Sequence, residues 1–315
     1  MKNAKLDSPF FIKRLSSLLL PITTPFDQTQ QVDAAALRKN LQKWSATGIT
    51  GFVLLGSTGE RVHLDEYEYL KLIETARAEV SSELQFWVGA GQQSTLGTIN
   101  EIKRASQAGA DAVLVITPSY YRSALTQEAL IEYYNAVADA APVPVILYSM
   151  PALTGIKIEP ATIARLADHR NIIGVKDSSA DIEGFRQTVE LCPTEFAVMT
   201  GNGTVFLDAL RSGAKGAILA VGCAVPEICV EILREFHAGD HEHAQVLQEK
   251  LGPLAAAVTS KYGIGGLKAA LDMQGYVGGS VRAPLQRPDA QAKTEIAQLL
   301  EDAKTAFRDL AAVGR

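Results

Sequence analysis

Residues 108–118 read AGADAVLVITP. Gly109 in this stretch is suited to the end of a helix, and a short apolar run rich in β-branched residues begins soon after it. The same pattern recurs at residues 47–51 (TGITG) and 212–216 (SGAKG), each just before another apolar run. Because glycine tolerates the left-handed conformation that ends many helices, each stretch marks a passage from helix to strand. The repetition predicts a chain built from βα units.

Eight strand-length apolar runs occur along the chain, spaced by about the length of one strand plus one helix. They are Leu18–Phe26, Gly51–Gly56, Phe86–Gly91, Ala112–Pro118, Pro144–Tyr148, Ile172–Lys176, Phe196–Gly201 and Gly216–Val221. Helix starts lie between them, at Asp65 with Glu68 three residues later, at Ser94 and at Thr126. Eight such units favour closure into a (β/α)₈ barrel over an open sheet.

Strand signals stop after Val221, and helical patterns continue at about 226–237, 242–260, 265–274 and 289–312. We take the first of these as the eighth barrel helix. The prediction is a barrel over residues 16–238 and a C-terminal helical region over 239–315. The faces of that region are apolar and rich in alanine, so it must either cover the barrel or contact another subunit.

Composition excludes several classes of function. The 315 residues carry 30 Lys and Arg against 35 Asp and Glu, a net charge of −5, so no basic surface for nucleic acid is expected. The first 20 residues carry Lys13 and Arg14 within their apolar part, which is typical of neither a membrane span nor a secretory signal. We therefore expect a cytoplasmic protein without a membrane partner.

The three cysteines and five histidines do not form a metal-binding pattern. Cys192, Cys223 and Cys229 share no C-x-x-C spacing, and we interpret them as apolar fillers in a reducing compartment. His241 and His243, the only close histidines, stand two residues apart and would lie on different faces of a helix. No metal site is predicted.

Lys176 is the strongest candidate for chemistry, because it ends the apolar strand 172–176 at the barrel end where active sites lie. Ile172, Gly174 and Lys176 should share one face, with Gly174 leaving room for a substrate. Burial disfavours the ammonium form, and a neutral amine can attack a ketone to form a Schiff base. The alternative is an outward lysine paired with Asp177.

Two further groups are expected at the same end of the barrel. Tyr148 closes the preceding strand, where a phenol could relay protons, although an ordinary amphipathic tyrosine is the alternative. Residues 56–60 (GSTGE) offer hydroxyls and backbone N–H groups that suit a carboxylate, or form a plain turn. A rival interpretation takes residues 201–204 (GNGT) as the phosphate cradle of a phosphosugar enzyme.

Three motifs carry a resemblance to the Schiff-base pyruvate lyases, the family of dihydrodipicolinate synthase and N-acetylneuraminate lyase. They are residues 56–60 (GSTGE), Tyr148 with the PALTG of residues 151–155, and residues 174–178 (GVKDS), and the likeness spans about Pro21–Leu285. The resemblance implies that Lys176 forms the Schiff base and Tyr148 relays protons. Ser57 and Thr58 match positions that hold the pyruvyl carboxylate. Tyr120, or its neighbour Tyr121, matches a tyrosine that reaches across a dimer interface into the active site of the partner subunit.

Departures from the family pattern bear on the substrate. The synthases carry an arginine where this chain has Leu153, and the neuraminate lyases carry acidic residues where it has Gly203 and Thr204. The overall likeness is greatest to 4-hydroxy-2-oxoglutarate aldolase, in segments such as residues 117–122 (TPSYYR) and 262–268 (YGIGGLK). One departure is Thr58, where the eukaryotic aldolase has asparagine.

The resulting prediction is a Schiff-base aldolase that cleaves 4-hydroxy-2-oxoglutarate to pyruvate and glyoxylate, with no cofactor beyond the imine on Lys176. Dihydrodipicolinate synthesis, a related sugar-acid aldolase or dehydratase, and a non-catalytic 2-oxo acid sensor are the alternatives. The expected partners are a small 2-oxo acid and further copies of the chain, as a dimer or tetramer. The predicted catalytic residues are Lys176, Tyr148, Ser57 and Tyr120, and the predicted substrate-binding residues are Gly56, Ser57, Thr58, Ser178, Gly201, Asn202 and Leu219.

Overall fold

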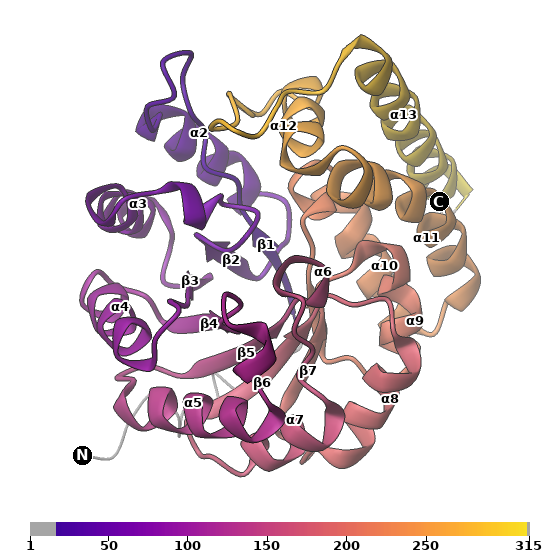
Figure 1. Cartoon of the computed structure of the whole chain (residues 1–315). Helices are drawn as coiled ribbons and strands as arrows, with labels where there is room; N and C mark the ends of the chain where they lie inside the picture. The colour runs from indigo at the N-terminus through magenta and orange to yellow at the C-terminus, as the bar shows by residue number, and fades with distance from the viewer. Residues whose placement is uncertain (1–16, 314–315) are drawn as a thin grey trace.

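The computed structural model describes residues 17–313, and its centre is a closed barrel of eight parallel strands. Each strand pairs with its neighbours in chain order, and β8 closes the ring against β1 (Figure 1). The strands are β1 (Leu18–Pro21), β2 (Gly51–Leu54), β3 (Gln85–Ala90), β4 (Ala112–Ile116), β5 (Val145–Ser149), β6 (Ile172–Asp177), β7 (Ala197–Thr200) and β8 (Gly216–Ile218). The predicted (β/α)₈ barrel is confirmed.

Helices follow every strand and, apart from the short α6 that Figure 1 labels near the centre of the view, form the outer ring. They are α2 (Ala34–Ser45), α3 (Glu66–Glu79), α4 (Thr95–Gln107), α5 (Gln127–Ala140), α6 (Pro151–Thr154), α7 (Pro160–Ala167), α8 (Ile182–Leu191), α9 (Phe206–Arg211) and α10 (Pro226–Ala238). Short 3₁₀ turns lie at η1 (Arg61–His63), η2 (Arg122–Ala124), η3 (Gly203–Val205) and η4 (Val221–Cys223). Asp65, Ser94 and Thr126 cap α3, α4 and α5 as predicted.

The glycines that punctuate the sequence have the expected conformation. Gly48, Gly109 and Gly213 have φ of 83°, 105° and 94°, each between a helix and the following strand. This left-handed region strains residues that carry a Cβ. Several strands end earlier than predicted, because the residues beyond them bond to loops: Thr24, predicted in the first strand, donates its hydroxyl to the Gly59 carbonyl at 2.7 Å.

Two apolar clusters fill the molecule. The larger lies between the strands and the outer helices, and the smaller lies inside the barrel. The interior cluster is Leu19, Val53, Trp87, Ala112, Leu114, Ile146, Tyr148, Ala197, Met199 and Ile218. These side chains fill the interior of the barrel, so the barrel is a packed core without a pore. An active site is therefore expected at the mouth formed by the carboxyl ends of the strands.

The start of β6 corrects one prediction. The pairing register with β5 shifts so that Val145 faces Ile172 but Ile146 faces Gly174, which is a bulge. Consequently Ile172 packs in the outer cluster while Ile173 packs against the interior, so Ile172 does not share the face of Lys176. Gly174 also leaves no room for a substrate: a Cβ there would lie 2.6 Å from the Ala197 carbonyl oxygen on β7.

The C-terminal region consists of α11 (His241–Ala256), a π-helical turn (Ala257–Lys261), α12 (Gly263–Met273) and α13 (Ala290–Val313). Figure 1 shows α12 beside α2, and Asn40 of α2 exchanges two hydrogen bonds of 2.8 Å with Val277 just after α12. These contacts show that at least part of the region covers the barrel. The division at residues 238 and 239 stays a prediction, and residue 16 lies outside the described residues.

Two predictions about composition can be set beside the structure. Cys192, Cys223 and Cys229 are all free, and Cys223 and Cys229 are fully buried in the outer cluster. Burial raises the pKa of both of these thiols, which keeps them protonated. Over residues 17–313, no helix combines the length and apolar character that crossing a membrane requires.

Candidate active site

Lys176 and Tyr148 stand side by side at the mouth of the barrel. Tyr148 on β5 is the direct register partner of Lys176 on β6. The Lys176 Nζ lies 4.4 Å from the centre of the Tyr148 ring, which belongs to the interior cluster. The predicted juxtaposition of amine and phenol is therefore present, and the amine points into the barrel mouth.

The Lys176 amine is buried without an ionic partner. Its side chain is 4% exposed, and no hydrogen bond or ion pair joins its Nζ to any residue within 17–313. The alternative pairing with Asp177 does not occur, because the Asp177 carboxylate accepts the Ser179 N–H at 2.6 Å. Burial raises the pKa of Asp177. An amine without a partner at this position is free to attack a carbonyl carbon.

The loop of residues 56–60 reaches Tyr148 from the other side. The Ser57 Oγ lies 2.9 Å from the Tyr148 hydroxyl, so a proton can pass along the two oxygens. Thr58 in the same loop is buried. No atom lies within 4 Å of the place where a Cβ of Gly56 would stand, so the backbone of this turn borders open space.

Ser178 and Gly201 complete the surroundings of the lysine. A Cβ on Gly201 would lie 2.5 Å from the Lys176 Cε and would collide with the Ser178 Oγ, so glycine is required for this close approach. The Ser178 hydroxyl is buried and has no hydrogen-bond partner among the described residues. An unpaired buried hydroxyl beside the amine is available to a polar group of a substrate.

The remaining predicted residues lie in different surroundings. Asn202 caps η3, because its Oδ1 accepts the Thr204 N–H at 3.0 Å. This bond occupies a donor that a phosphate cradle would need. Leu219 is fully buried in the outer cluster, so its side chain does not line the mouth. Tyr120 and Tyr121 are 76% and 70% exposed and pack edge to face, with ring centres 5.0 Å apart.

Sequence reasoning gave no role to Glu60 and Lys268, which form a buried ion pair beside the site. The Lys268 Nζ lies 2.6 Å from the Glu60 Oε1, and both side chains are at most 2% exposed. Lys268 stands alone among apolar and glycine residues in residues 263–271 (GIGGLKAAL). A charge in so apolar a helix signals a buried partner, although the sequence does not say which acid it is.

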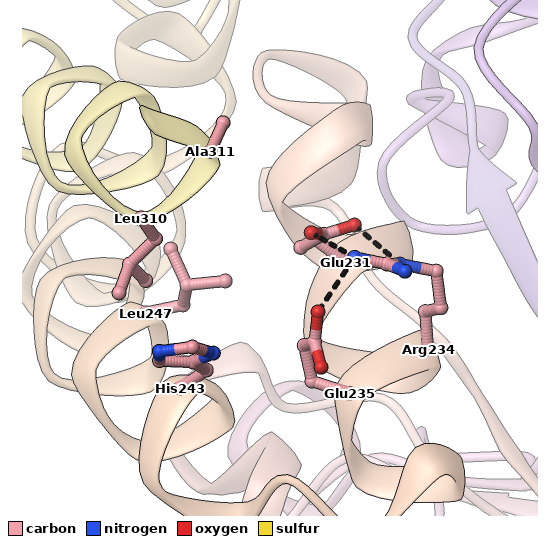
Figure 2. Close-up of a pocket in the computed structure, with 7 residues that line it drawn as sticks. All are labelled: Glu231, Arg234, Glu235, His243, Leu247, Leu310 and Ala311. Carbon is pink, nitrogen blue, oxygen red and sulfur yellow. Dashed lines mark hydrogen bonds and ion pairs between the residues drawn. The ribbon is translucent and has the colours of Figure 1, made fainter. Parts of the chain in front are cut away.

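A separate hollow lies away from the barrel mouth, between α10, α11 and α13 (Figure 2). There Arg234 bonds to Glu231 and Glu235, both at 2.6 Å. Glu235, Asp240 and His243 bring three possible metal ligands within 4.8 Å of one another. Each already has a partner, since the His243 Nδ1 lies 2.9 Å from the Asp240 carboxylate. We assign no ion to this cluster.

The geometry at the mouth suits imine chemistry. A buried amine can attack a carbonyl carbon, the adjacent phenol can move the protons that dehydration requires, and the iminium can accept the electrons of a breaking C–C bond. The reaction needs a nucleophilic amine and a proton relay that lie close to each other. Lys176 lies against Tyr148, and Tyr148 meets Ser57, so candidates for both groups are together here.

Comparison with known proteins agrees with this chemistry. The model of the dihydrodipicolinate synthetase family matches residues 14–303. The 4-hydroxy-tetrahydrodipicolinate synthase of Thermodesulfovibrio yellowstonii is 34% identical over 285 residues, covering 90% of this chain and 97% of the relative. The enzyme of the same name from Syntrophus aciditrophicus is 32% identical over 284 residues, with the same coverage.

Solved structures give the same result. A dihydrodipicolinate synthase from Thermotoga maritima superposes with a TM-score of 0.86 at 29% identity, covering 91% of this chain and 98% of its own. A monomeric dihydrodipicolinate synthase variant gives 0.88 at 29% identity, covering 94% and 98%. Enzymes of this family form a Schiff base between a lysine and pyruvate and use no external cofactor. The chain is a member of the dihydrodipicolinate synthetase family, whose members are Schiff-base-forming lyases and synthases that act on pyruvate.

Proposed function

We propose that the protein is a 4-hydroxy-2-oxoglutarate aldolase, with Lys176 as the Schiff-base nucleophile and Tyr148 as the proton relay. The observation that carries this proposal is the position of the Lys176 Nζ, which has no partner within residues 17–313 and lies 4.4 Å from the ring of Tyr148. The Tyr148 hydroxyl in turn meets Ser57 at 2.9 Å. A nucleophile and its proton relay must lie close together, and the Lys176 amine lies against the Tyr148 ring.

In this proposal the cleavage uses the amine and the phenol in turn. The Lys176 amine adds to the C2 carbonyl, and loss of water gives an iminium. Tyr148, hydrogen-bonded to Ser57, takes the proton of the C4 hydroxyl, and the electrons of the C3–C4 bond move into the iminium as glyoxylate leaves. The enamine is protonated at C3, and water releases pyruvate and the free amine. The iminium is the electron sink throughout.

Binding of the pyruvyl carboxylate falls to the 56–60 loop in this proposal. Gly56, Ser57 and Thr58 supply N–H and hydroxyl groups next to Tyr148, and the unpaired hydroxyl of Ser178 lies on the other side of the lysine. Gly201 keeps that side open by carrying no Cβ. Asn202 contributes by fixing the loop after β7, since its Nδ2 donates to the Ser179 carbonyl at 3.3 Å.

The choice of aldolase over synthase rests on the loop after β5. Leu153 stands where the synthases carry arginine, and its side chain is 62% exposed. The exposed Arg122 lies against this loop, since a Cβ on Gly155 would stand 2.9 Å from its Cδ and Nη1. A guanidinium there is suited to the distal carboxylate of 4-hydroxy-2-oxoglutarate. The names of the curated relatives favour dihydrodipicolinate synthesis as the second candidate.

A side-by-side assay decides between these candidates. We expect kcat/KM for cleavage of 4-hydroxy-2-oxoglutarate to exceed that for condensation of pyruvate with aspartate semialdehyde by at least about tenfold, a difference of ~1.4 kcal/mol in transition-state binding. Arg122→Met should raise KM for the dicarboxylate and leave imine formation with pyruvate unchanged. A clear preference of the wild type for condensation would overturn the proposed substrate.

The oligomer is part of the same proposal. Tyr120 and Tyr121 form an exposed aromatic pair on the loop after β4, as expected of a side chain offered to a neighbouring subunit. We take Tyr120 as the residue that completes the proton relay of the partner subunit. Sedimentation at assay concentrations measures the oligomeric state. A monomer at high dilution that retains full activity would contradict this assignment.

A further inference from the structure

The Glu60–Lys268 ion pair is the most deeply buried one in the described part of the chain. Lys268 Nζ also donates to the Ser280 carbonyl at 2.6 Å, and the second carboxylate oxygen of Glu60 accepts the Arg282 N–H at 3.1 Å. The His63 Nδ1 lies 3.2 Å from the same oxygen. Of the ion pairs within residues 17–313, it alone has both side chains at most 2% exposed.

Such a pair is poorly explained by stability alone. Moving two charges out of water costs several kcal/mol each, and their attraction repays this only with good geometry and further hydrogen bonds. Apolar residues of the same volume are often as stabilising or more so. The pair joins positions 208 residues apart, one in the active-site loop and one in the C-terminal region. What it fixes is therefore the relative position of these two segments.

The loop that ends at Glu60 has a strained backbone and needs stabilising contacts from outside the loop. Leu55 and Glu60, at its two ends, have φ of 59° and 55°, the left-handed region that residues with a Cβ rarely adopt. Conformations of this kind are costly in free energy and persist only where surrounding contacts enforce them. Within the loop, the Glu60 N–H donates to the Ser57 carbonyl at 3.1 Å, so the backbone of Glu60 directly constrains Ser57.

Ser57 in turn meets the phenol of the proposed relay, with its Oγ 2.9 Å from the Tyr148 hydroxyl. We propose that the Lys268–Glu60 ion pair is a positioning device that holds the 55–60 turn so that Ser57 is aligned with Tyr148, which makes the C-terminal region part of the catalytic support. Lys268 and Glu60 are positioning residues and do not contact the substrate. The inference rests on the proposed roles of Ser57 and Tyr148.

The test measures the rate at which pyruvate forms a borohydride-trappable imine on the full-length protein. Lys268→Met is compared in the wild-type and Ser57→Ala backgrounds, with thermal unfolding followed in parallel. We expect the rate to fall about tenfold in the wild-type background and less than about twofold once Ser57 is absent, because residues acting through one another are not additive. Lys261→Met is the control, since Lys261 binds the exposed Glu295 in the same C-terminal region.

A second variant keeps the test decisive if the Lys268→Met protein does not fold. Glu60→Gln combined with Lys268→Met removes both charges, so we expect folding to recover while imine formation stays slow. Equal slowing in both Ser57 backgrounds, or a rate that recovers together with stability, would reduce the pair to a structural role and overturn the inference. The readout uses pyruvate alone, so failure to cleave 4-hydroxy-2-oxoglutarate would count against the proposed function only.

Discussion

Lys176 and Lys268 are equally hidden from water, yet their surroundings are opposite. Lys176 is 4% exposed and has no acidic partner within the described chain, whereas Lys268 is 2% exposed and bonded to Glu60 and the Ser280 carbonyl. Burial lowers the pKa of Lys268, and the Glu60 carboxylate opposes that shift. The difference shows how one residue type serves two purposes: a lysine paired with a carboxylate holds structure, and a lysine without a partner is available for bond formation.

The largest expected effect separates the two lysines by activity. Lys176→Met removes the nucleophile, so we expect kcat to fall by at least ~10⁴-fold, the scale seen when a covalent catalyst is deleted. The stability of this variant should equal or exceed that of the wild type, because an unpartnered buried amine is replaced by an apolar chain. Steady-state kinetics and chemical denaturation measure the two effects. A strongly destabilised Lys176→Met protein would contradict the comparison.

Lys268 should show the reverse order of effects. Lys268→Met leaves the Glu60 carboxylate buried without its cation, and breaking such a pair costs about 3–5 kcal/mol of unfolding free energy. Activity should fall far less than in Lys176→Met. Urea unfolding of both single variants, with Lys261→Met as the exposed-pair control, measures this contrast. Equal stabilities for Lys268→Met and Lys261→Met would show that burial of the pair has no energetic consequence.

The smallest expected effect concerns a half-buried pair close to Lys268. Glu68 accepts two hydrogen bonds of 2.7 Å from Arg282, and this interaction lowers the pKa of Glu68 from its ordinary 4.5. A carboxyl whose pKa is lowered on folding stabilises the protein above pH 4.5, and this contribution disappears as the pH falls through the lowered value. Glu68→Gln should therefore cost about 1 kcal/mol at pH 7.

The same variant should match the wild type in stability once the pH is well below 4.5. Denaturation at a series of pH values gives the difference directly. Glutamine still suits the capping box with Asp65 at the start of α3, so the cap is largely preserved. A stability difference that is independent of pH would show that the carboxylate charge is not the cause.

The fold was predictable because its signals are local. Gly48, Gly109 and Gly213 mark helix ends, and the apolar runs between them have strand length, so eight βα units follow from neighbouring residues alone. The bulge in β6 was not predictable, because it depends on how β6 pairs with β5. A strand pattern of period two places Ile172 inside the barrel, and the shifted register places Ile173 there instead.

The site was predictable in part for the same reason. Lys176 and Tyr148 end consecutive parallel strands, and a barrel brings such residues together at one end. The bond between Ser57 and Tyr148 and the pair between Glu60 and Lys268 join residues 91 and 208 positions apart. Sequence separation of this kind leaves no trace in the local pattern. The family resemblance placed Ser57 at the site with Tyr148, whereas the Glu60–Lys268 pair emerged only from the folded chain.

Covalent trapping with pyruvate identifies the nucleophilic lysine most directly. The wild-type protein is incubated with pyruvate and borohydride, digested, and searched by mass spectrometry for reduced adducts on both buried lysines. We expect an adduct on Lys176 and none on Lys268, and no adduct in Lys176→Met. Absence of any adduct, or an adduct carried by another lysine, would contradict the claim that the unpartnered amine at the barrel mouth is the nucleophile.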